Sequence, residues 1–365
     1  MHKTRIGIIG CGNVSANYLR HAPLFPGIEV AAVADLDMSR ARERAEQFEI
    51  PRACTVEQLL TDPDIELVVN LTVPKAHYSV AMGAMEAGKH VFNEKPLAAT
   101  RDEGQRLVDA AHEKGLRLGG APETFLGSGQ QAARRTIDDG LIGRPVAGTA
   151  FMMSPGPEAW HPDPDFFYQY GGGPLFDMGP YYLMSLLHLL GPVRQVTAAA
   201  GIQKPDRTIG SGERAGEALV VETPDHIAGV ITFESGAIVT LVTSFAVRAH
   251  RHAPIEIYGT DASLSVPDPN GFDGEVLLCE QRRGEWKPIA MNYCQGYGRS
   301  VGVADMAASI HNGREHRASG VQALAVLDLM EAFLESARSG CAVAPRVSYQ
   351  RPAPMPEGLE PGQMD

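Results

Sequence analysis

Two patterns of hydrophobic positions follow one another along the chain, and they change near residue 121. Up to that point short β-branched and aliphatic runs alternate with helical stretches, which is typical of a parallel, doubly wound sheet. Beyond it hairpin patterns appear, notably over 228–233 and 238–245 on either side of a Glu-Ser-Gly turn. We therefore expect an α/β domain over 1–121, an α+β domain with an open, largely antiparallel sheet over 122–350, and a loosely held Pro-rich tail over 351–365.

The same patterns give the bounds of individual elements. Capping residues and glycine stops place the helices, and β-branched runs place the strands. In the first part they predict helices over 39–48, with Ser39 as N-cap, 77–87 and 102–114, and strands over 5–9, 30–34, 67–71, 90–93 and 116–119. In the second part they predict helices over 130–139 and 321–337 and further strands over 255–258, 263–266 and 276–279.

A glycine turn directly follows the first predicted strand. Gly10 permits a tight turn, and Gly12 lets the backbone approach a pyrophosphate held at the N-terminus of the next helix. The third position of this fingerprint is Ser15 rather than Gly or Ala, so the glycines alone also fit a purely structural turn. If a dinucleotide binds here, Asn13 and Val14 are expected to contact it together with the two glycines.

An acidic residue, Asp35, closes the second predicted strand, where a carboxylate in such folds holds the adenosine ribose. An Asp that only caps a turn is the alternative interpretation. This carboxylate and Asp37 repel the additional phosphate of NADP, although Arg40 and Arg42 on the next helix partly compensate. The turn and Asp35 together predict a Rossmann domain with NAD as the cofactor, and Leu36 and Arg40 are among the expected contacts.

The end of the third predicted strand adds further contacts. Ligands of an open α/β sheet lie over the carboxyl ends of its strands, so the cofactor should border Leu71, Thr72, Val73 and Pro74. His77 follows at the start of the next predicted helix, and we include it among the cofactor contacts. A hydrogen bond from His77 to a backbone group is the alternative.

The strand over 90–93 ends in Glu94-Lys95-Pro96. Pro96 stops the strand and sets the direction in which Lys95 leaves the sheet. An ammonium in the ligand crevice stabilises the oxyanion that develops when a secondary alcohol loses hydride. A surface lysine in a turn explains this motif equally well. We predict Glu94 and Lys95 beside the cofactor, with Lys95 also contacting the substrate.

A second motif lies far downstream, where Gly171-Gly172-Gly173 precedes Asp177-Met178-Gly179-Pro180-Tyr181. Consecutive glycines indicate a close backbone approach, and Asp177 and Tyr181 share one helix face if a helix has begun by Asp177. Glu-Lys-Pro combined with Gly-Gly-Gly and Asp-x-Gly-x-Tyr resembles the Gfo/Idh/MocA oxidoreductases. These are sugar and inositol dehydrogenases that join a Rossmann domain to an open-sheet domain. The resemblance extends from the opening glycine turn to the hairpins of the second part.

The resemblance implies a catalytic set of Lys95, Asp177 and Tyr181. Many family members carry histidine in place of Tyr181 as the general base, whereas glucose-fructose oxidoreductase is similar to this chain in having tyrosine. A phenol, whose pKa is ordinarily about 10, is a poor base at neutral pH unless a cation such as Lys95 lowers that pKa. We therefore pair Tyr181 with Lys95 and expect Asp177 to hold the substrate hydroxyl or Lys95.

Further substrate contacts are expected in an aromatic loop before the three glycines. Trp160 offers a flat face to a sugar, and His161 offers a polar group, although such a loop equally fits a contact with a neighbouring subunit. Glu123, at the junction of the two predicted domains, is a third candidate contact. A basic cluster made of Arg248, His250, Arg251 and His252 fits either a solvated turn or an anionic sugar.

Composition narrows the partners. The 365 residues carry a net charge of −12 and the pI is near 5.5, which argues against nucleic acid or an anionic membrane. The five cysteines form no CxxC pair and the histidines lack ligand spacing, so we expect neither disulfides nor a metal. The first strand begins a few residues from Met1, and no apolar run reaches membrane-spanning length. We expect a cytoplasmic protein that forms a homo-oligomer, a dimer or tetramer, through its open sheet.

Three functions are consistent with these features. The first is NAD-dependent oxidation of a secondary hydroxyl of a sugar, glycoside or cyclitol. The second is NAD-dependent glycoside hydrolysis, in which transient oxidation of the sugar permits elimination of the aglycone before water is added and the hydride returns. The third is a non-catalytic NAD-binding regulator on the same fold. The three-residue catalytic set favours an enzyme.

Overall fold

The computed structural model describes residues 3–282 and 284–365. They divide into two compact units. The first contains residues 3–131 and receives two later stretches, 291–327 and 352–365. The second contains the described residues of 132–290 together with 328–351. The prediction assigned residues 122–350 to one domain and did not foresee that residues 291–327 belong to the first unit.

A six-stranded parallel sheet forms the centre of the first unit, in the order β3-β2-β1-β4-β5-β6. Parallel pairing places Ile9 opposite both Ala34 and Asn70, so the carboxyl ends of β1, β2 and β4 meet at one edge. This confirms the predicted doubly wound α/β domain. The strands are β1 (Thr4–Ile9), β2 (Ile28–Ala34), β3 (Ala53–Cys54), β4 (Leu67–Asn70), β5 (His90–Asn93) and β6 (Leu118–Gly120).

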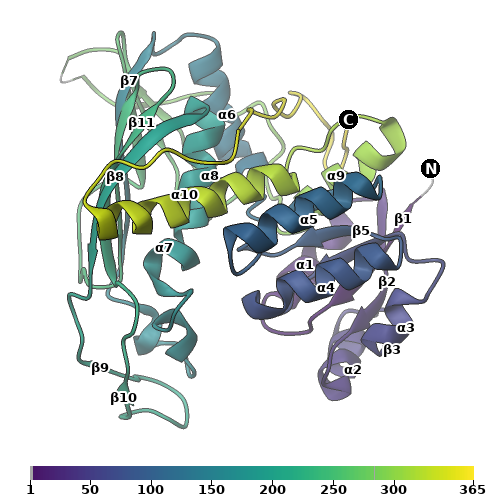
Figure 1. Ribbon diagram of the computed structural model, residues 1–365. Coiled ribbons are helices and arrows are strands. Elements are labelled where there is room, and N and C mark those ends of the chain that lie inside the picture. The colour runs from purple at the N-terminus through teal and green to yellow at the C-terminus, as the bar shows by residue number, and fades with distance from the viewer. Residues whose placement is uncertain (1–2, 283) are drawn as a thin grey trace. The chain divides into compact units, whose positions relative to one another are not determined.

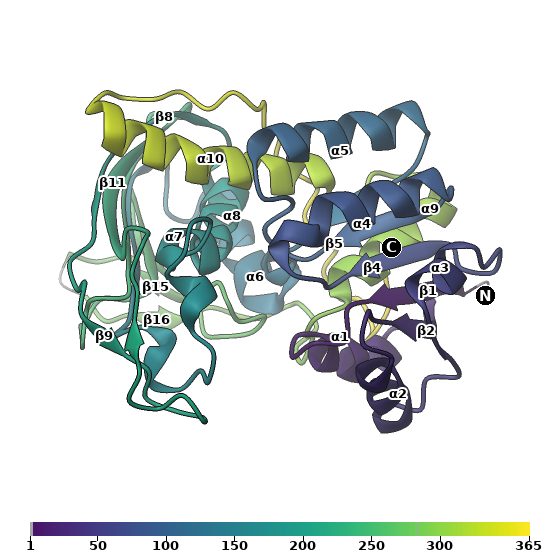
Figure 2. The ribbon, with the colours of Figure 1, turned by 60° about the horizontal axis from the view of Figure 1, so that its bottom comes forward.

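Helices cover both faces of this sheet, with α4 and α5 on one face and α1 and α2 on the other (Figure 2). Two helices, α6 and α10, carry the chain from residues of one unit to residues of the other. The helices are α1 (Ser15–His21), α2 (Met38–Gln47), α3 (Val56–Leu60), α4 (Pro74–Glu86), α5 (Arg101–Glu113), α6 (Ser128–Asp138), α9 (Val301–Asn312) and α10 (Gly320–Ser339), with short 3-10 turns η1 (Ala22–Leu24) and η2 (Thr124–Leu126).

Two predicted helix starts are corrected. The N-cap of α2 is Asp37 rather than Ser39, because the Asp37 carboxylate accepts the Ser39 backbone N–H at 2.9 Å. Helix α4 begins at Pro74 rather than at His77. Proline suits the first helical position because its fixed φ is already helical and the missing N–H has no intrahelical partner there.

The C-terminal tail is anchored, which corrects the predicted loosely held arm. Arg317 donates two hydrogen bonds to the Asp365 carboxylate, at 2.9 and 2.8 Å. Gly362 donates its backbone N–H to the Tyr297 hydroxyl at 3.2 Å, and Met355 is 5% exposed. The proline-rich composition suggested a free arm, but these contacts come from side chains far away in the sequence.

The second unit is built on an eight-stranded sheet in the order β16-β15-β14-β13-β7-β12-β11-β8 (Figure 1). Neighbouring strands are antiparallel except for the parallel pair β7 and β12, which confirms the predicted open, largely antiparallel sheet. The strands are β7 (Pro145–Met153), β8 (Val193–Gly201), β11 (His226–Phe233), β12 (Ile238–Ser244), β13 (Ile255–Gly259), β14 (Ser263–Val266), β15 (Leu277–Cys279) and β16 (Lys287–Pro288).

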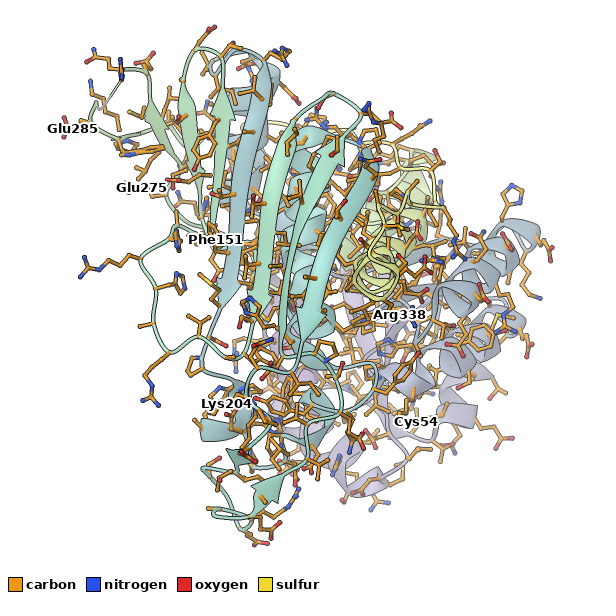
Figure 3. All side chains as sticks on the ribbon, turned by 60° about the vertical axis from the view of Figure 1, so that its left-hand side comes forward. Cys54, Phe151, Lys204, Glu275, Glu285 and Arg338 are labelled. Atoms are coloured by element: carbon orange, nitrogen blue, oxygen red, sulfur yellow. The ribbon has the colours of Figure 1, made fainter. Side chains whose placement is uncertain are left out.

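One face of this sheet is packed and the other is open. Every residue of helix α8 (Gly179–Leu190) is buried, and α8 contacts β7 while α7 (Gly173–Asp177) contacts β12. The opposite face turns toward the viewer in Figure 3, where the helices of this unit lie behind the sheet. A small second sheet of β9 (Arg207–Thr208) and β10 (Ala218–Leu219) forms a separate hairpin.

Candidate cofactor and substrate sites

The glycine turn of the first unit has the geometry that its sequence predicts. Gly10 adopts φ +102°, and an added Cβ would lie 2.6 Å from the carbonyl carbon and oxygen of Leu71. At Gly12 an added Cβ would have nothing within 4 Å, so this stretch of backbone is open to a ligand. Ser15, in the third fingerprint position, donates its hydroxyl to the Gly12 carbonyl at 2.6 Å and fixes the turn instead of a third glycine.

The Asp35 carboxylate joins this turn to the end of β2. Its Oδ2 accepts the Cys11 backbone N–H at 2.7 Å, and its Oδ1 accepts the Asp37 backbone N–H at 2.9 Å. Both oxygens retain a further lone pair for a ligand hydroxyl. Burial raises the pKa of the Cys11 thiol to about 12, so Cys11 stays a neutral, small side chain within the turn.

Two apolar side chains stand unusually exposed at the carboxyl edge of this sheet. Leu36 after β2 is 97% exposed, and Val73 after β4 is 66% exposed. Apolar side chains presented next to a glycine turn and a carboxylate suit the flat faces of a nucleotide. A dinucleotide therefore fits the residues that surround this edge.

The Lys95 turn is fixed by its neighbour Glu94. The Glu94 side chain is 6% exposed; one oxygen accepts the Tyr18 hydroxyl at 3.1 Å and the other accepts the Lys95 backbone N–H at 2.7 Å. The Lys95–Pro96 peptide bond is cis, and Lys95 is half-buried. Lys95 thus leaves the sheet from a main chain that is held in one place.

His77 is sealed inside the first unit. It is 1% exposed, with Nδ1 2.6 Å from the Pro96 carbonyl oxygen and Nε2 3.0 Å from the Thr72 carbonyl oxygen. This is the backbone-bonding alternative that the sequence left open. Asn70 supports the same region, because its side chain donates to the His77 carbonyl at 3.1 Å.

Glu123 is fully buried, and its charged partner Arg299 was not among the predicted site residues. Arg299, in the stretch that returns to the first unit, donates to Glu123 Oε2 at 3.3 Å. Glu123 Oε1 has no hydrogen-bond donor among the described residues. Burial, opposed in part by Arg299, raises the pKa of Glu123 above its ordinary value. Nothing near Glu123 in the sequence signals Arg299; only the chain return brings it there.

In the second unit the predicted continuous helix through Asp177 and Tyr181 is interrupted. Helix α7 ends at Asp177, and α8 begins at Gly179 after Met178. Pro180 accounts for the break, because proline has no N–H to donate to the carbonyl of Phe176 and its ring clashes there. The Tyr181 N–H instead bonds to the Met178 carbonyl at 3.2 Å.

Both residues of this pair lie at the interrupted turn. Asp177 is half-buried, whereas Tyr181 is 5% exposed, in the first turn of α8. The four-residue spacing alone therefore does not place the two side chains on one helix face, because they belong to different helices.

The aromatic loop before the three glycines presents exposed rings. Trp160 is 66% exposed, and its ring centroid lies 5.5 Å from that of the half-buried His161. Phe166, which is 55% exposed, lies edge-on to His161 at 5.3 Å. These rings form an accessible aromatic surface between η3 (Pro157–Ala159) and η4 (Asp165–Phe167).

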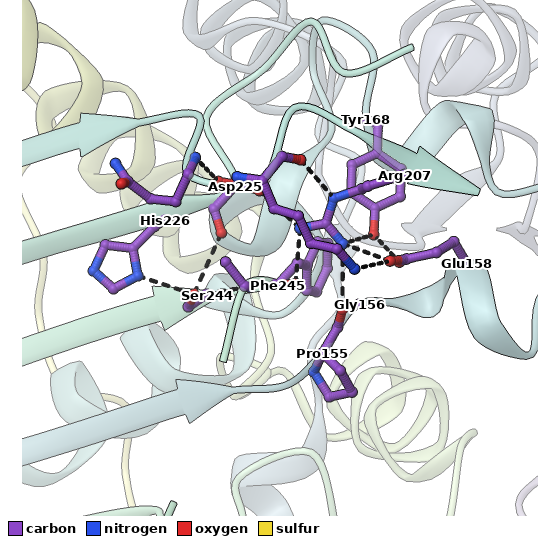
Figure 4. A network of polar contacts seen from close by, with 12 residues as sticks. Pro155, Gly156, Glu158, Tyr168, Arg207, Asp225, His226, Ser244 and Phe245 are labelled. Atoms are coloured by element: carbon purple, nitrogen blue, oxygen red, sulfur yellow. Dashed lines mark hydrogen bonds and ion pairs between the residues drawn. The ribbon is translucent and has the colours of Figure 1, made fainter. Parts of the chain in front are cut away.

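A buried ionic network holds the base of this loop (Figure 4). The Arg207 side chain is 0% exposed and donates to Glu158 Oε1 at 2.7 Å, to Asp225 Oδ2 at 2.7 Å and to the Tyr168 hydroxyl at 3.0 Å. Tyr168 also donates its hydroxyl to Glu158. Burial opposes the charged form of Glu158, but the hydrogen bond from Tyr168 and the Arg207 charge leave the pKa of Glu158 below its ordinary value.

The basic cluster of Arg248, His250, Arg251 and His252 is exposed. The His252 ring stacks on Phe151 at 4.3 Å between centroids. Phe151 points away from the helix-covered face, because its neighbours Ala150 and Met152 on β7 are the buried ones.

The described residues contain no group of His, Cys, Asp and Glu arranged to hold a metal ion. Within those same residues no helix is both long and apolar enough to cross a bilayer.

The parallel sheet, the glycine turn and the acidic residue at the end of β2 define the first unit as a dinucleotide-binding Rossmann domain. The model of the oxidoreductase family with an NAD-binding Rossmann fold matches residues 4–120, and the model of the GFO/IDH/MocA C-terminal domain matches residues 130–265. The chain belongs to the GFO/IDH/MocA family of oxidoreductases, as its motifs predicted, and NAD is the cofactor of its Rossmann domain.

Three relatives are similar to the chain along about three quarters of their length. The chain is 28% identical to 1,5-anhydro-D-fructose reductase of Ensifer adhaerens over 71% of this chain and 74% of the relative. It is 28% identical to levoglucosan dehydrogenase of Pseudarthrobacter phenanthrenivorans, over 72% and 73%. An uncharacterised oxidoreductase of Rhizobium meliloti is 31% identical, over 74% and 76%.

Solved structures show the same fold at lower identity. Levoglucosan dehydrogenase in complex with NADH and L-sorbose superimposes with a TM-score of 0.80 at 24% identity, over 94% of this chain and 99% of the other. The aldose-aldose oxidoreductase of Caulobacter crescentus in complex with glycerol also gives 0.80, at 22% identity, over 94% and 100%.

Proposed function

We propose that this protein is an NAD-dependent dehydrogenase that oxidises a secondary hydroxyl of a sugar, glycoside or cyclitol. The observation that carries the proposal is the place of Lys95. It follows β5 on a fixed main chain, in the same sheet whose carboxyl edge carries the glycine turn and Asp35. The relatives named for levoglucosan and 1,5-anhydro-D-fructose support a carbohydrate as the substrate.

The residues that would hold NAD lie along the carboxyl edge of the first sheet. NAD, when bound, supplies the hydride acceptor. His77, predicted as a further contact, is sealed behind this edge and is not assigned to NAD. We assign the contacts of NAD to the glycine turn, the ends of β2, β4 and β5 and the beginnings of the helices that follow: Gly10, Gly12, Asn13, Val14, Asp35, Leu36, Arg40, Leu71, Thr72, Val73, Pro74, Glu94 and Lys95.

The proton chemistry is assigned to Lys95, Asp177 and Tyr181. We assign Tyr181, as its phenolate, to accept the proton of the substrate hydroxyl, and the Lys95 ammonium to stabilise the developing oxyanion. Asp177 accepts a hydrogen bond from the substrate hydroxyl or from Lys95. These roles rest on the family motif and on the chemistry of the three side chains.

Substrate binding is assigned to the aromatic loop and to Glu123. Trp160 and His161 present an exposed aromatic face with a polar edge, which suits a sugar ring. Glu123 contributes its Oε1, which has no hydrogen-bond donor among the described residues. An anionic sugar gains no support from the basic cluster, because His252 packs on the open face of the sheet.

The open face of the eight-stranded sheet supports a homo-oligomer. Ile238 on β12 is 51% exposed and Val230 on β11 is 40% exposed, so this face presents apolar side chains to its surroundings. Size measurement in solution tests this. A cytoplasmic location also stays a prediction.

Substrate oxidation is tested with NAD and a panel of levoglucosan, D-xylose, myo-inositol and 4-nitrophenyl glycosides. A dehydrogenase accumulates NADH, whereas a glycosidase releases 4-nitrophenol without net NADH. Lys95→Met should lower turnover about 100- to 1000-fold while NAD affinity changes little. Near-normal turnover in that variant would overturn the dehydrogenase proposal. So would a panel in which no compound reduces NAD while a glycoside releases its aglycone.

A further inference from the structure

One buried histidine links two segments of the cofactor edge. His77 faces the Pro96 carbonyl oxygen through Nδ1 at 2.6 Å and the Thr72 carbonyl oxygen through Nε2 at 3.0 Å. Thr72 lies between β4 and α4, and Pro96 directly follows Lys95. A single side chain that is 1% exposed therefore contacts both the loop after β4 and the Lys95 turn.

The two contacts are not equivalent, because a neutral imidazole has only one N–H and both partners are acceptors. Burial lowers the pKa of His77 most strongly, and the charge of Lys95 lowers it further. The two carbonyls and Glu94 raise this pKa but do not outweigh burial, so the pKa of His77 lies below its ordinary value. At neutral pH the ring thus donates to one carbonyl only. The shorter distance assigns the N–H to Nδ1 and the hydrogen bond to Pro96.

Lys95 is consequently fixed on both sides of its own backbone. On the N-terminal side, Glu94 accepts the Lys95 N–H at 2.7 Å. On the C-terminal side, the Pro96 carbonyl is held by His77. The carboxylate of Glu94 is itself held by the Tyr18 hydroxyl, so both supports come from buried groups.

We propose that His77 is a positioning residue for Lys95, which it holds in place through its Nδ1–H bond to the Pro96 carbonyl. This inference rests on the proposed role of Lys95 in proton chemistry. His77 then affects turnover rather than cofactor affinity, because a displaced ammonium stabilises the developing oxyanion less well.

Two substitutions distinguish the hydrogen bond from His77 to the Pro96 carbonyl from a role of the ring in packing alone. His77→Asn keeps an amide N–H near the position of Nδ1 and can still donate to Pro96. His77→Gln places its amide near the position of Nε2 and can donate only toward Thr72. Both variants remove the ring and are neutral, so each is the control of the other.

We expect His77→Gln to lower kcat about 10- to 100-fold and His77→Asn to stay within about threefold of the wild type. Affinity for NAD, measured by calorimetry, should change less than about threefold in both. Turnover is measured with the best substrate of the panel above. Equal losses of kcat in the two variants, or a loss of NAD affinity in place of kcat, would show that His77 only packs.

The Lys95→Met background distinguishes failure of this inference from failure of the proposed function. If His77 acts through Lys95, adding His77→Gln to Lys95→Met should lower kcat no further. If Lys95→Met alone keeps its turnover, the proposed role of Lys95 is wrong. If Lys95→Met loses turnover while His77→Gln does not, only the positioning role is wrong.

A readout that needs no substrate completes the test. Reductive ¹³C-methylation gives each lysine an NMR signal, and the Lys95 signal is assigned by its loss in Lys95→Met. His77→Gln should shift the titration of the Lys95 signal, and His77→Asn should restore it. An unchanged Lys95 titration in His77→Gln contradicts the proposal.

Discussion

The cofactor edge of the first unit and the aromatic loop of the second are both fixed, but by different kinds of interaction. At the cofactor edge, the Asp35 and His77 side chains bond to main-chain groups of Cys11 and Pro96, which are 24 and 19 residues away in the sequence. At the aromatic loop, Arg207 joins side chains that are 49 and 18 residues away in the sequence, Glu158 and Asp225. The parallel strands bring the first pairs together at one edge of the sheet, where the sequence motifs lie. No motif indicates the buried ion pairs of the second arrangement.

The largest effect is expected from breaking the ionic network. Arg207→Met leaves Glu158 and Asp225 as buried carboxylates without their cation, which should cost about 3 to 5 kcal/mol of unfolding free energy. Urea unfolding of the two proteins measures it. Arg214→Met is the matched control, because Arg214 makes its ion pairs near the same loop while more exposed. Equal losses in both variants would mean that burial does not distinguish the two arginines.

The glycine turn sharpens the comparison at the cofactor edge. Gly10→Ala introduces a Cβ 2.6 Å from the Leu71 backbone at a φ of +102°, which should cost at least about 1 to 2 kcal/mol of stability. Gly12→Ala meets nothing within 4 Å and should fold normally. Its methyl group should instead weaken NAD binding about tenfold or more, because it stands where the backbone approaches the pyrophosphate. Thermal unfolding and NAD titration of both variants measure these effects, and Gly12→Ala with unchanged NAD affinity would place the pyrophosphate elsewhere.

The sequence predicts the first unit well because its signals are local. Gly10, Asp35 and Lys95 each follow an apolar strand, and parallel pairing places the ends of such strands at one edge. Helix α9 was not predicted, because eight of its residues are buried and it lacks the polar face that marks an amphipathic helix.

The second unit shows what local patterns do not reveal. The spacing of Asp177 and Tyr181 predicts one helix face if one helix has begun by Asp177, yet the chain forms two helices, and Pro180 accounts for the break between them. The Arg207 network of this unit has no sequence signature, and neither has the contact of Arg299 with Glu123 in the first unit, since each joins segments that only the fold brings together.

The next prediction compares the loss of stability in acid that one buried histidine of each unit causes. Burial, with Arg134 and Arg351 nearby, places the pKa of His188 well below its ordinary value. Below about pH 6.5 the unfolded chain binds a proton that folded His188 does not, so stability falls as pH decreases, at about 1.4 kcal/mol for each unit of pKa difference. His77 follows the same sign, but its carbonyl partners oppose the shift.

His188→Asn tests this assignment, because its amide oxygen can lie near the position of Nδ1 and accept the Arg134 N–H that His188 Nδ1 accepts at 3.3 Å. We expect this variant to resemble the wild type near pH 7 and to lose less stability than the wild type between pH 6.5 and 5. Calorimetric unfolding across that range measures the difference. A parallel loss of stability in both proteins would assign the acid response to other groups.

The smallest effect concerns the choice between NAD and NADP, and the hydrogen bonds of Asp35 decide which variant tests it. Asp35→Ala removes the carboxylate that repels a 2′-phosphate, but it also leaves the Cys11 and Asp37 N–H groups without an acceptor. Asp35→Asn removes the charge while its amide oxygen still accepts one of these bonds. We therefore expect Asp35→Asn to narrow the preference for NAD by roughly tenfold, about 1.4 kcal/mol, with little loss of stability, whereas Asp35→Ala should lose stability as well. Titration of each variant with both cofactors, beside its thermal unfolding, separates the two effects. If the unaltered protein binds NADP more tightly than NAD, the Asp35 carboxylate does not exclude the 2′-phosphate, and its proposed role is wrong.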